Sequence, residues 1–120
     1  MSKKILIVDD EKPLAKALEL KLNHEGLQAE AVFNGDEAIK ALKSGSFNLV
    51  LLDLVMPDTD GFSVLEEIKK MKIKTSVIVS SNLSQEEDQE KAKELGAIDY
   101  FVKSDTTLAD IVDRIKQHLT

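Results

Sequence analysis

The sequence predicts an α/β fold, with helices packed against a parallel sheet. Two observations lead to this prediction. Apolar runs of strand length alternate five times with segments of helical period. The strongest runs, Ile5–Val8 and Leu49–Leu52, are continuous rather than alternating, which is typical of strands buried on both faces. Strands joined through helices run parallel, with right-handed crossovers.

The first part of the chain supplies two strand–helix pairs. Ile5–Val8 is short and β-branched, and the helical stretch from about Lys12 to Glu25 has a proline in its first turn and leucines at i, i+4 spacing. Ala29–Val32 is a weaker, more polar strand. Asp36–Lys43 is a short helix with apolar residues on one side, and Ser44-Gly45 ends it.

The middle of the chain contains the most apolar run. Leu49–Leu52 is therefore expected to be the central strand. A loop through Pro57 and Gly61 follows it, and helical period then extends from Phe62 to about Met71. Val77–Val79 is expected to be a fourth buried strand.

The last part of the chain supplies two further helices and a strand. Ser84 and Glu87 have the spacing of a capping box, so a helix is expected from there to Leu95. Ile98–Val102 is a fifth strand. Apolar residues from Leu108 to Leu119 are spaced as one face of a closing helix.

Size and composition limit the classes of protein. The chain has 120 residues, of which 42% are hydrophobic, so residues 1–120 are expected to form one domain, with no output domain in this chain. The sequence leaves open whether this domain stands alone or belongs to a longer regulator. The net charge of −6 argues against direct binding of nucleic acid, which usually requires a basic face. The absence of Cys excludes a disulfide framework, a thiolate nucleophile and a Cys-based zinc site.

The sequence also bears on localisation. No apolar run approaches the ~20 residues of a membrane span. The N-terminus, Met1-Ser2-Lys3-Lys4, leads into an apolar run without a signal-peptide cleavage pattern. A soluble, cytoplasmic protein is therefore expected.

Polar residues stand at the ends of four predicted strands. Asp9 and Asp10 follow the first strand, Asp53 the third, Ser81 the fourth and Lys103 the fifth. In open parallel sheets the site lies at the carboxyl ends of the strands, near the point where strand order reverses. Three carboxylates, a hydroxyl and an ammonium are therefore expected to converge at one edge.

This set of groups suits phosphoryl transfer assisted by a metal. Carboxylates in one pocket repel each other, and a divalent cation such as Mg²⁺ (or Mn²⁺) removes the conflict. A carboxylate is a known nucleophile that forms an aspartyl-phosphate. A metal, a Lys and a hydroxyl can stabilise the charge of the transition state. Taken alone, Asp9-Asp10 is typical of a cap or turn and Lys103 of a solvated surface lysine, so the joint placement carries the prediction.

From Lys4 to Leu119 the sequence resembles the receiver (CheY-like) domains of two-component response regulators. The resemblance implies a flavodoxin-like (βα)5 three-layer sandwich with a five-stranded parallel sheet of order 2-1-3-4-5. It rests on four motifs: Ile5-Leu6-Ile7-Val8-Asp9-Asp10, Leu51-Leu52-Asp53-Leu54-Val55-Met56-Pro57, Asp60-Gly61, and Gly96-Ala97 with Tyr100-Phe101-Val102-Lys103.

The resemblance assigns roles to these residues. Asp53 would be the phosphoacceptor. Asp10 and Asp53 would bind Mg²⁺ directly, together with the backbone carbonyl of Val55, and Asp9 would assist through water or hydrogen bonds. Ser81 and Lys103 would each bind a phosphoryl oxygen. Such a protein is a switch that contributes catalytic groups to its own phosphorylation and autodephosphorylation, not an enzyme with a separate substrate.

The resemblance also implies partners. A sensor histidine kinase or a phosphotransfer protein would donate the phosphoryl group. Tyr100 would turn inward as Ser81 moves toward the phosphate, although a packed strand aromatic is an equal interpretation of Tyr100. A downstream protein would then bind the face made by the fourth helix, fifth strand and fifth helix. For the fifth helix, with Asp110, Asp113, Arg114 and Lys116, the face of a phosphorylation-linked homodimer and an ordinary solvated surface are both open.

The sequence departs from the family pattern around the site. Many members have proline after the lysine, usually with a cis bond, whereas this chain has Ser104, so either the bond is cis at a cost of about 2.5–4 kcal/mol or it is trans and the loop differs. Asn82 replaces a frequent alanine and either narrows access or adds a hydrogen bond. Val55 and Leu83 are apolar where the hydrolytic water would pass, which predicts a long-lived phosphoryl group.

Three alternatives remain at this stage. An aspartyl-nucleophile phosphatase of the haloacid dehalogenase type would need a second Asp two residues after the nucleophile, where this chain has Val55. A flavodoxin-like electron carrier would need a phosphate-binding loop after the first strand, where Asp9 and Asp10 would repel the phosphate. A degenerate receiver that binds partners without phosphorylation is supported by Ser104 alone.

Overall fold

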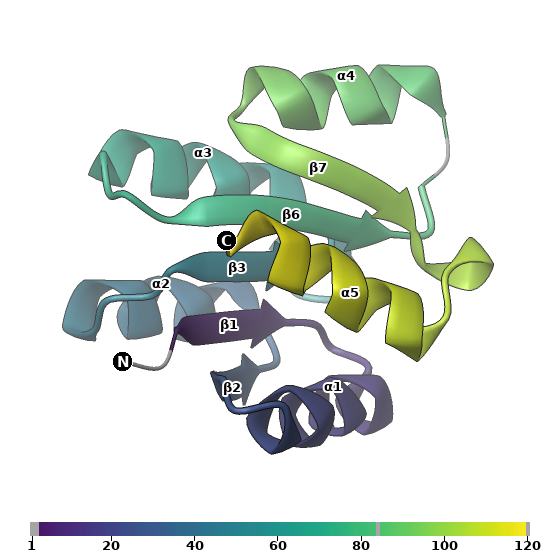
Figure 1. Ribbon diagram of the computed structural model, residues 1–120. Coiled ribbons are helices and arrows are strands. Elements are labelled where there is room, and N and C mark those ends of the chain that lie inside the picture. Colours follow the sequence, from purple (N-terminus) through teal and green to yellow (C-terminus); the bar gives the residue numbers. More distant parts are fainter. Residues whose placement is uncertain (1–2, 84, 120) are drawn as a thin grey trace.

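The computed structural model describes residues 3–83 and 85–119. The parallel sheet has the order β2-β1-β3-β6-β7, which confirms the predicted order 2-1-3-4-5 (Figure 1). Its strands are β1 Lys4–Val8, β2 Gln28–Val32, β3 Leu49–Leu52, β6 Ser76–Ser81 and β7 Ala97–Val102. The helices are α1 Lys12–His24, α2 Gly35–Ser44, α3 Gly61–Met71, α4 Glu86–Glu94 and α5 Leu108–His118, with a short 3₁₀ helix, η1, at Lys103–Asp105.

Helices cover both faces of the sheet, so the molecule has three layers (Figure 1). Alternate residues of each central strand point to opposite faces. In β1, Ile5 and Ile7 pack with α1 and α5, whereas Leu6 and Val8 pack with α2, α3 and α4. All four side chains are fully buried. The continuous apolar runs of the sequence are therefore explained by two cores that share one sheet.

The segment between β3 and α3 differs from the predicted simple loop. It contains a small antiparallel pair, β4 Val55–Met56 and β5 Thr59–Asp60, joined by a tight turn. The turn brings Gly61 back against the end of β3, where Gly61 N–H donates to Leu54 O at 3.0 Å. A Cβ at Gly61 would lie 2.6 Å from the Asp53 carbonyl oxygen, so only glycine allows this approach.

Helix α4 and strand β7 each depart from the regular pattern expected from the sequence. Helix α4 begins at Glu86 with Gln85 as its N-cap, and the Gln85 side chain makes no capping bond. Ser84, which the sequence suggested as the cap, lies outside the described residues. In β7 the pairing with β6 shifts by one residue beside Ile98, and the Ile98 side chain is 48% exposed. This irregularity explains why an apolar strand residue faces solvent.

Candidate functional site

The five predicted residues lie at the carboxyl edge of the sheet, toward which the strand arrows point in Figure 1. Asp9 and Asp10 follow β1, Asp53 follows β3, Ser81 ends β6 and Lys103 follows β7. Carboxylate oxygens of the three aspartates lie within 4.8 Å of one another. The sequence prediction that these groups converge is therefore confirmed for the carboxylates.

Lys103 joins the carboxylates at the centre of the site. Its Nζ lies 2.9 Å from Asp9 Oδ2 and 3.4 Å from Asp53 Oδ2. All three side chains are at least nine-tenths buried. An ammonium held this close to Asp53 can also reach a phosphoryl oxygen attached to that carboxylate.

The backbone around Asp53 fixes its carboxylate. Asp53 N–H donates to Val8 O at 3.0 Å, which continues the pairing of β3 with β1. Asp53 Oδ1 accepts a hydrogen bond of 3.2 Å from Val55 N–H in the turn that follows. The other oxygen, Oδ2, is directed to Lys103, so each side-chain oxygen of Asp53 has a partner.

Burial has the largest effect on the pKa values of Asp9 and Asp53. It raises the pKa of Asp53 to about 6, against the lowering effect of Lys103. Burial likewise raises the pKa of Asp9 above its ordinary value, although Lys103 and the Glu11 N–H oppose the shift. Burial alone would lower the pKa of Lys103, but its hydrogen bonds to Asp9 and Glu11 raise it, so the ammonium stays charged.

A divalent cation fits this arrangement. The three aspartates supply hard oxygen donors within a short span, and such donors are those that Mg²⁺ prefers. Two of them, Asp9 and Asp53, carry a cost for being charged while buried, which a cation would remove. The acidic cluster is thus able to bind a metal ion.

Ser81 and Tyr100 are connected through Leu83. The Ser81 side chain is fully buried, and its Oγ accepts from Leu83 N–H at 3.3 Å. Tyr100 Oη donates to the Leu83 carbonyl oxygen at 2.7 Å. Tyr100 is 9% exposed, so the ring already lies inward, and burial raises the pKa of its hydroxyl.

The bond between Lys103 and Ser104 is trans, like the other peptide bonds of the described chain. Of the two conformations left open by the sequence, the trans bond with an altered loop is the observed one. The chain turns after β7 through η1 rather than through a cis-proline. Lys103 Nζ nevertheless reaches Asp53, so Ser104 does not displace the lysine.

Sequence reasoning missed Glu11. Its Oε1 lies 2.9 Å from Lys103 Nζ, closer than Asp53, although the Glu11 side chain is 53% exposed. Glu11 directly follows the acidic pair, which is the only sequence signal for it. That signal is weak because the contact depends on the path of the loop between β1 and α1.

Val55 and Leu83, which the sequence predicts to affect hydrolysis, line an open groove beside the site. The groove has a volume of about 440 Å³ and is lined by residues 54–60, Phe62 and Leu83. Val55 is 57% exposed in it. The groove thus begins at Leu54, the residue after Asp53, and contains both Val55 and Leu83 in its lining.

Comparisons with known proteins agree with this geometry. The family model described as "Response regulator receiver domain" matches residues 5–116. The chain is 34% identical over 117 residues to the transcriptional regulatory protein DltR of Streptococcus agalactiae serotype III, covering 95% of this chain and 52% of that protein. It thus spans about half the length of the curated relatives it matches.

Two solved structures are also similar. A CheY-like response regulator receiver domain protein from Methanospirillum hungatei is 28% identical, with a TM-score of 0.92, over 99% of this chain and 94% of that one. The response regulator TrrA of Thermotoga maritima, crystallised with Mg²⁺ and beryllium fluoride, is 33% identical, with a TM-score of 0.83, over 97% and 98%. Within the described residues, none of the helices is long and apolar enough to cross a membrane.

Proposed function

This chain belongs to the response regulator receiver domain family, and from that premise we propose that Asp53 accepts the phosphoryl group. The domain is a phosphoacceptor switch in two-component signalling rather than a classical enzyme. The observation that carries the assignment is the buried pair of Asp53 and Lys103, 3.4 Å apart, within the cluster of three aspartates. We further infer that residues 1–120 act as one receiver domain.

The transfer step follows from the placement of Asp53. A carboxylate oxygen of Asp53 attacks the phosphorus of a phosphohistidine on a kinase or phosphotransfer protein. The new O–P bond forms as the P–N bond breaks, and the bonding electron pair returns to the imidazole nitrogen. Lys103 donates to one phosphoryl oxygen, and the Ser81 hydroxyl, once released from Leu83, donates to another.

Asp10, Asp53 and the Val55 carbonyl are the proposed direct ligands of Mg²⁺ (or Mn²⁺), and Asp9 assists through water or a hydrogen bond. The bound cation neutralises charge on the acidic cluster and on the phosphoryl group. The matched TrrA structure, solved in complex with Mg²⁺ and beryllium fluoride, supports the binding of Mg²⁺ by a receiver domain of this fold.

The switch is proposed to pass through Leu83. Ser81 Oγ is bonded to the Leu83 N–H, and Tyr100 Oη to the Leu83 carbonyl, so a move of Ser81 toward the phosphate disturbs the Tyr100 contact. Phosphorylation would then select one of two arrangements of this loop. Tyr100 lies on β7, between α4 and α5, so a change in its position would alter the face formed by these three elements.

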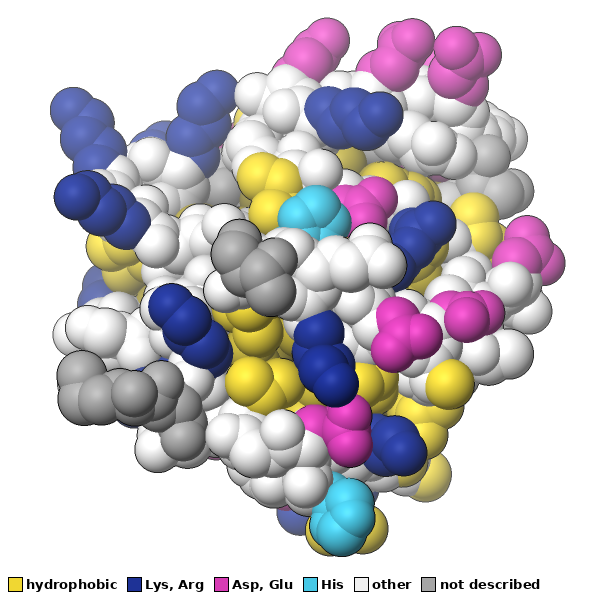
Figure 2. All heavy atoms as spheres, in the orientation of Figure 1, with side chains coloured by type: hydrophobic (Ala, Val, Ile, Leu, Met, Phe, Trp, Pro, Cys, Tyr) yellow, Lys and Arg dark blue, Asp and Glu magenta, His cyan; other side chains and the backbone are white. Residues whose placement is uncertain are grey.

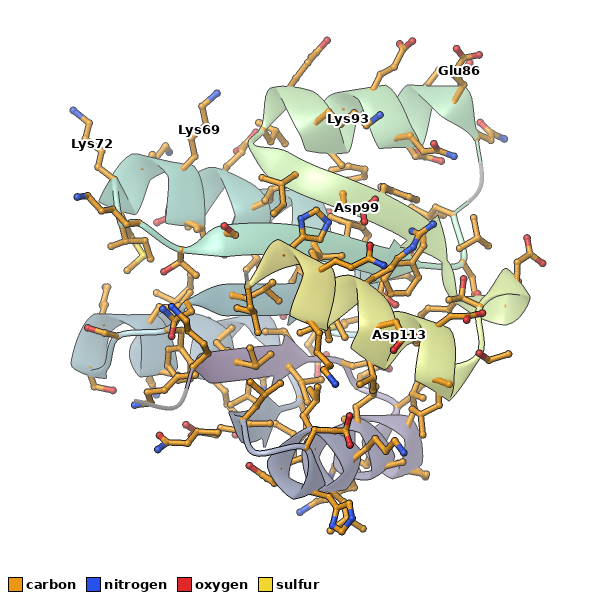
Figure 3. All side chains as sticks on the ribbon, in the orientation of Figure 1. Lys69, Lys72, Glu86, Lys93, Asp99 and Asp113 are labelled. Atoms are coloured by element: carbon orange, nitrogen blue, oxygen red, sulfur yellow. The ribbon has the colours of Figure 1, made fainter. Side chains whose placement is uncertain are left out.

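Receiver domains partner with histidine kinases, and the curated relative DltR is a transcriptional regulator. For this chain, we propose that a downstream protein, or a second copy, binds the face made by α4, β7 and α5. Ile98 is exposed there. Asp99 of the same strand (labelled in Figure 3) forms an ion pair with Arg114, with 3.6 Å between Oδ1 and Nη1. An apolar residue beside charged pairs is suited to a protein contact.

The two alternative functions from other protein families, an enzyme and an electron carrier, are not supported. Family membership sets aside the aspartyl-nucleophile phosphatase and the flavodoxin-like electron carrier. The degenerate receiver rested on Ser104, and the position of Lys103 beside Asp53 removes that support.

Beryllium fluoride, which mimics a phosphoryl group, gives a direct test of the proposed site. Tyr100 is the only Tyr in a chain without Trp, so tyrosine fluorescence reports on that residue alone. Titrating beryllium fluoride in the presence of Mg²⁺ should change this fluorescence in a saturable manner. Asp53→Asn should abolish the change. A full response in Asp53→Asn would refute the assignment of Asp53.

The predicted slow hydrolysis has its own measurement. The side chains of Val55 and Leu83 have no polar group that could orient a water molecule for attack on the phosphoryl group. Purified phosphoprotein should therefore decay over minutes or longer, and Val55→Glu should shorten its lifetime. Decay of the wild-type phosphoprotein within seconds would rule out this account of hydrolysis.

A further inference from the structure

The loops that carry Ser81 and Lys103 are joined beyond the end of the sheet. The parallel pairing of β6 with β7 ends at Ser81 and Val102. One residue beyond the end of β6, the side-chain oxygen of Asn82 accepts a hydrogen bond of 3.0 Å from Ser104 N–H. A side chain thus continues the connection between the two strands where the backbone ladder stops.

The backbone after Lys103 is held on its other side by Thr106. Thr106 N–H donates to Lys103 O at 3.2 Å, and Thr106 Oγ1 donates to Val102 O at 2.9 Å. The η1 turn is therefore anchored by Thr106 and by Asn82. The Asn82 bond exists only because Ser104 has an N–H, which a proline would lack.

This anchoring matters for the ammonium group. A lysine side chain has four flexible carbons, so the position of Nζ depends on where its backbone is fixed. Lys103 Nζ is shared among Asp9, Glu11 and Asp53, and Asp53 is the most distant of the three partners. A small shift of the η1 turn would favour one of the other carboxylates over Asp53.

We propose that Asn82 is a positioning residue for phosphoryl transfer: by holding the backbone of Ser104, it keeps Lys103 within reach of Asp53. The inference rests on the proposed function of Asp53. It also connects the two residues that bind the phosphoryl group, because Asn82 adjoins Ser81. A shift of Ser81 toward the phosphate would thus carry the Lys103 backbone with it.

The test measures the rate constant for phosphorylation of Asp53 by acetyl phosphate in saturating Mg²⁺. Asn82→Ala and Asn82→Leu both remove the acceptor, and Leu keeps the bulk of Asn. Both should slow the reaction by roughly threefold to tenfold, as expected for the loss of one hydrogen bond. Gln85→Ala is the matched control, because Gln85 is an exposed amide in the same loop without a capping bond.

A merely structural role of Asn82 would lower the thermal stability or the Mg²⁺ affinity of its variants, which the proposal does not predict. The Asn82–Ser104 bond is exposed, so thermal unfolding and Mg²⁺ binding by calorimetry should remain close to wild type in the Asn82 variants. In a Ser104→Pro background, which has already lost the donor, Asn82→Ala should have little further effect on the rate.

Two results would overturn the inference while leaving the proposed function intact. A faster reaction in Asn82→Ala, with Asn82→Leu near wild type, would mean that Asn82 only restricts access. An equal loss of rate from Asn82→Ala with Ser104 or Pro at position 104 would mean that it does not act through Ser104. If the wild type gains no phosphoryl group from acetyl phosphate or from its cognate kinase, the proposed function fails and this inference fails with it.

Discussion

At the residue scale, Lys103 is the residue on which the site depends, because three carboxylates compete for one ammonium. Glu11 and Asp9 are each 2.9 Å from Nζ, and Asp53 is 3.4 Å away. Glu11 is half exposed and lies on the solvent side, so its pairing with Lys103 is screened and weak. Lys103 can therefore exchange Glu11 for a phosphoryl oxygen at small cost.

Glu11→Gln should speed phosphorylation by acetyl phosphate by roughly twofold to fivefold, because an exposed ion pair is worth up to about 1 kcal/mol. Glu86→Gln makes the same change in net charge at the start of α4 and should leave the rate nearly unchanged. A slower reaction in Glu11→Gln would show that Glu11 positions Lys103 instead of competing for it.

The raised pKa of Asp53 predicts how stability depends on pH in metal-free protein. The folded state keeps the Asp53 proton up to about pH 6, whereas the unfolded chain releases it near pH 4. Because the folded state binds more protons in this window, the free energy of unfolding falls as pH rises through it. The charged form of Asp53 therefore destabilises the fold above pH 6.

Asp53→Asn removes this titration. In EDTA the variant should be more stable than the wild type by about 1–3 kcal/mol above pH 6, and the difference should shrink toward pH 4. Urea unfolding across this pH range measures it. A difference that does not vary with pH would contradict the account of Asp53.

At the scale of elements, the strands predicted from the sequence and those missed are determined by different kinds of contact. Strands β1 and β3 were predicted from continuous apolar runs, and burial on both faces leaves little alternative for such runs. The β4–β5 pair was missed, since it depends on the close approach of Gly61 to Asp53 across a turn. Local sequence does not reveal such contacts.

The same distinction applies within the site. Five site residues were predicted because each stands at a strand end, and parallel strands bring their ends to one edge. They are Asp9, Asp10, Asp53, Ser81 and Lys103. Glu11 was not predicted, and a hydrogen bond from Asn82 was only one of two alternatives, because loop path and side-chain rotamers decide these contacts.

The end of helix α3 contains a strained residue. Its C-cap, Lys72, has φ 54° and ψ 36°, the left-handed conformation that favours glycine (Figure 3). Lys72→Gly should raise the free energy of unfolding by about 0.5–1 kcal/mol. Lys70→Gly, inside the same helix, should lower it by about 1 kcal/mol. Urea denaturation distinguishes them, and a loss of stability in both would contradict the assignment of strain.

At the scale of the whole molecule, charge is divided between the two edges of the sheet. Every helix runs opposite to the strands, so helix N-termini share the carboxyl edge with the site. Acidic residues occupy the first turns of α2, α4 and α5, and basic residues the last turns of all five helices. Figure 2 shows lysines gathered near the end of α3 and acidic side chains over α4.

This arrangement complements the helix dipoles and gives the carboxyl edge a negative potential. Mg²⁺ should therefore raise the midpoint of thermal unfolding by binding the folded state, and rising NaCl concentration should weaken the effect. Asp10→Asn should reduce the Mg²⁺ effect, whereas Asp110→Asn, an acidic residue of α5 outside the cluster, should not. Stabilisation that survives in Asp10→Asn would exclude Asp10 as a ligand.

The most direct test of the central claim is the intact mass of the protein after incubation with acetyl phosphate. The wild type should gain one phosphoryl group when Mg²⁺ is present and none in EDTA, and Asp53→Asn should gain none. A gain that persists in Asp53→Asn would place the phosphoryl group on another residue. No gain in the wild type, even with its cognate kinase, would contradict the assignment of a phosphorylation switch.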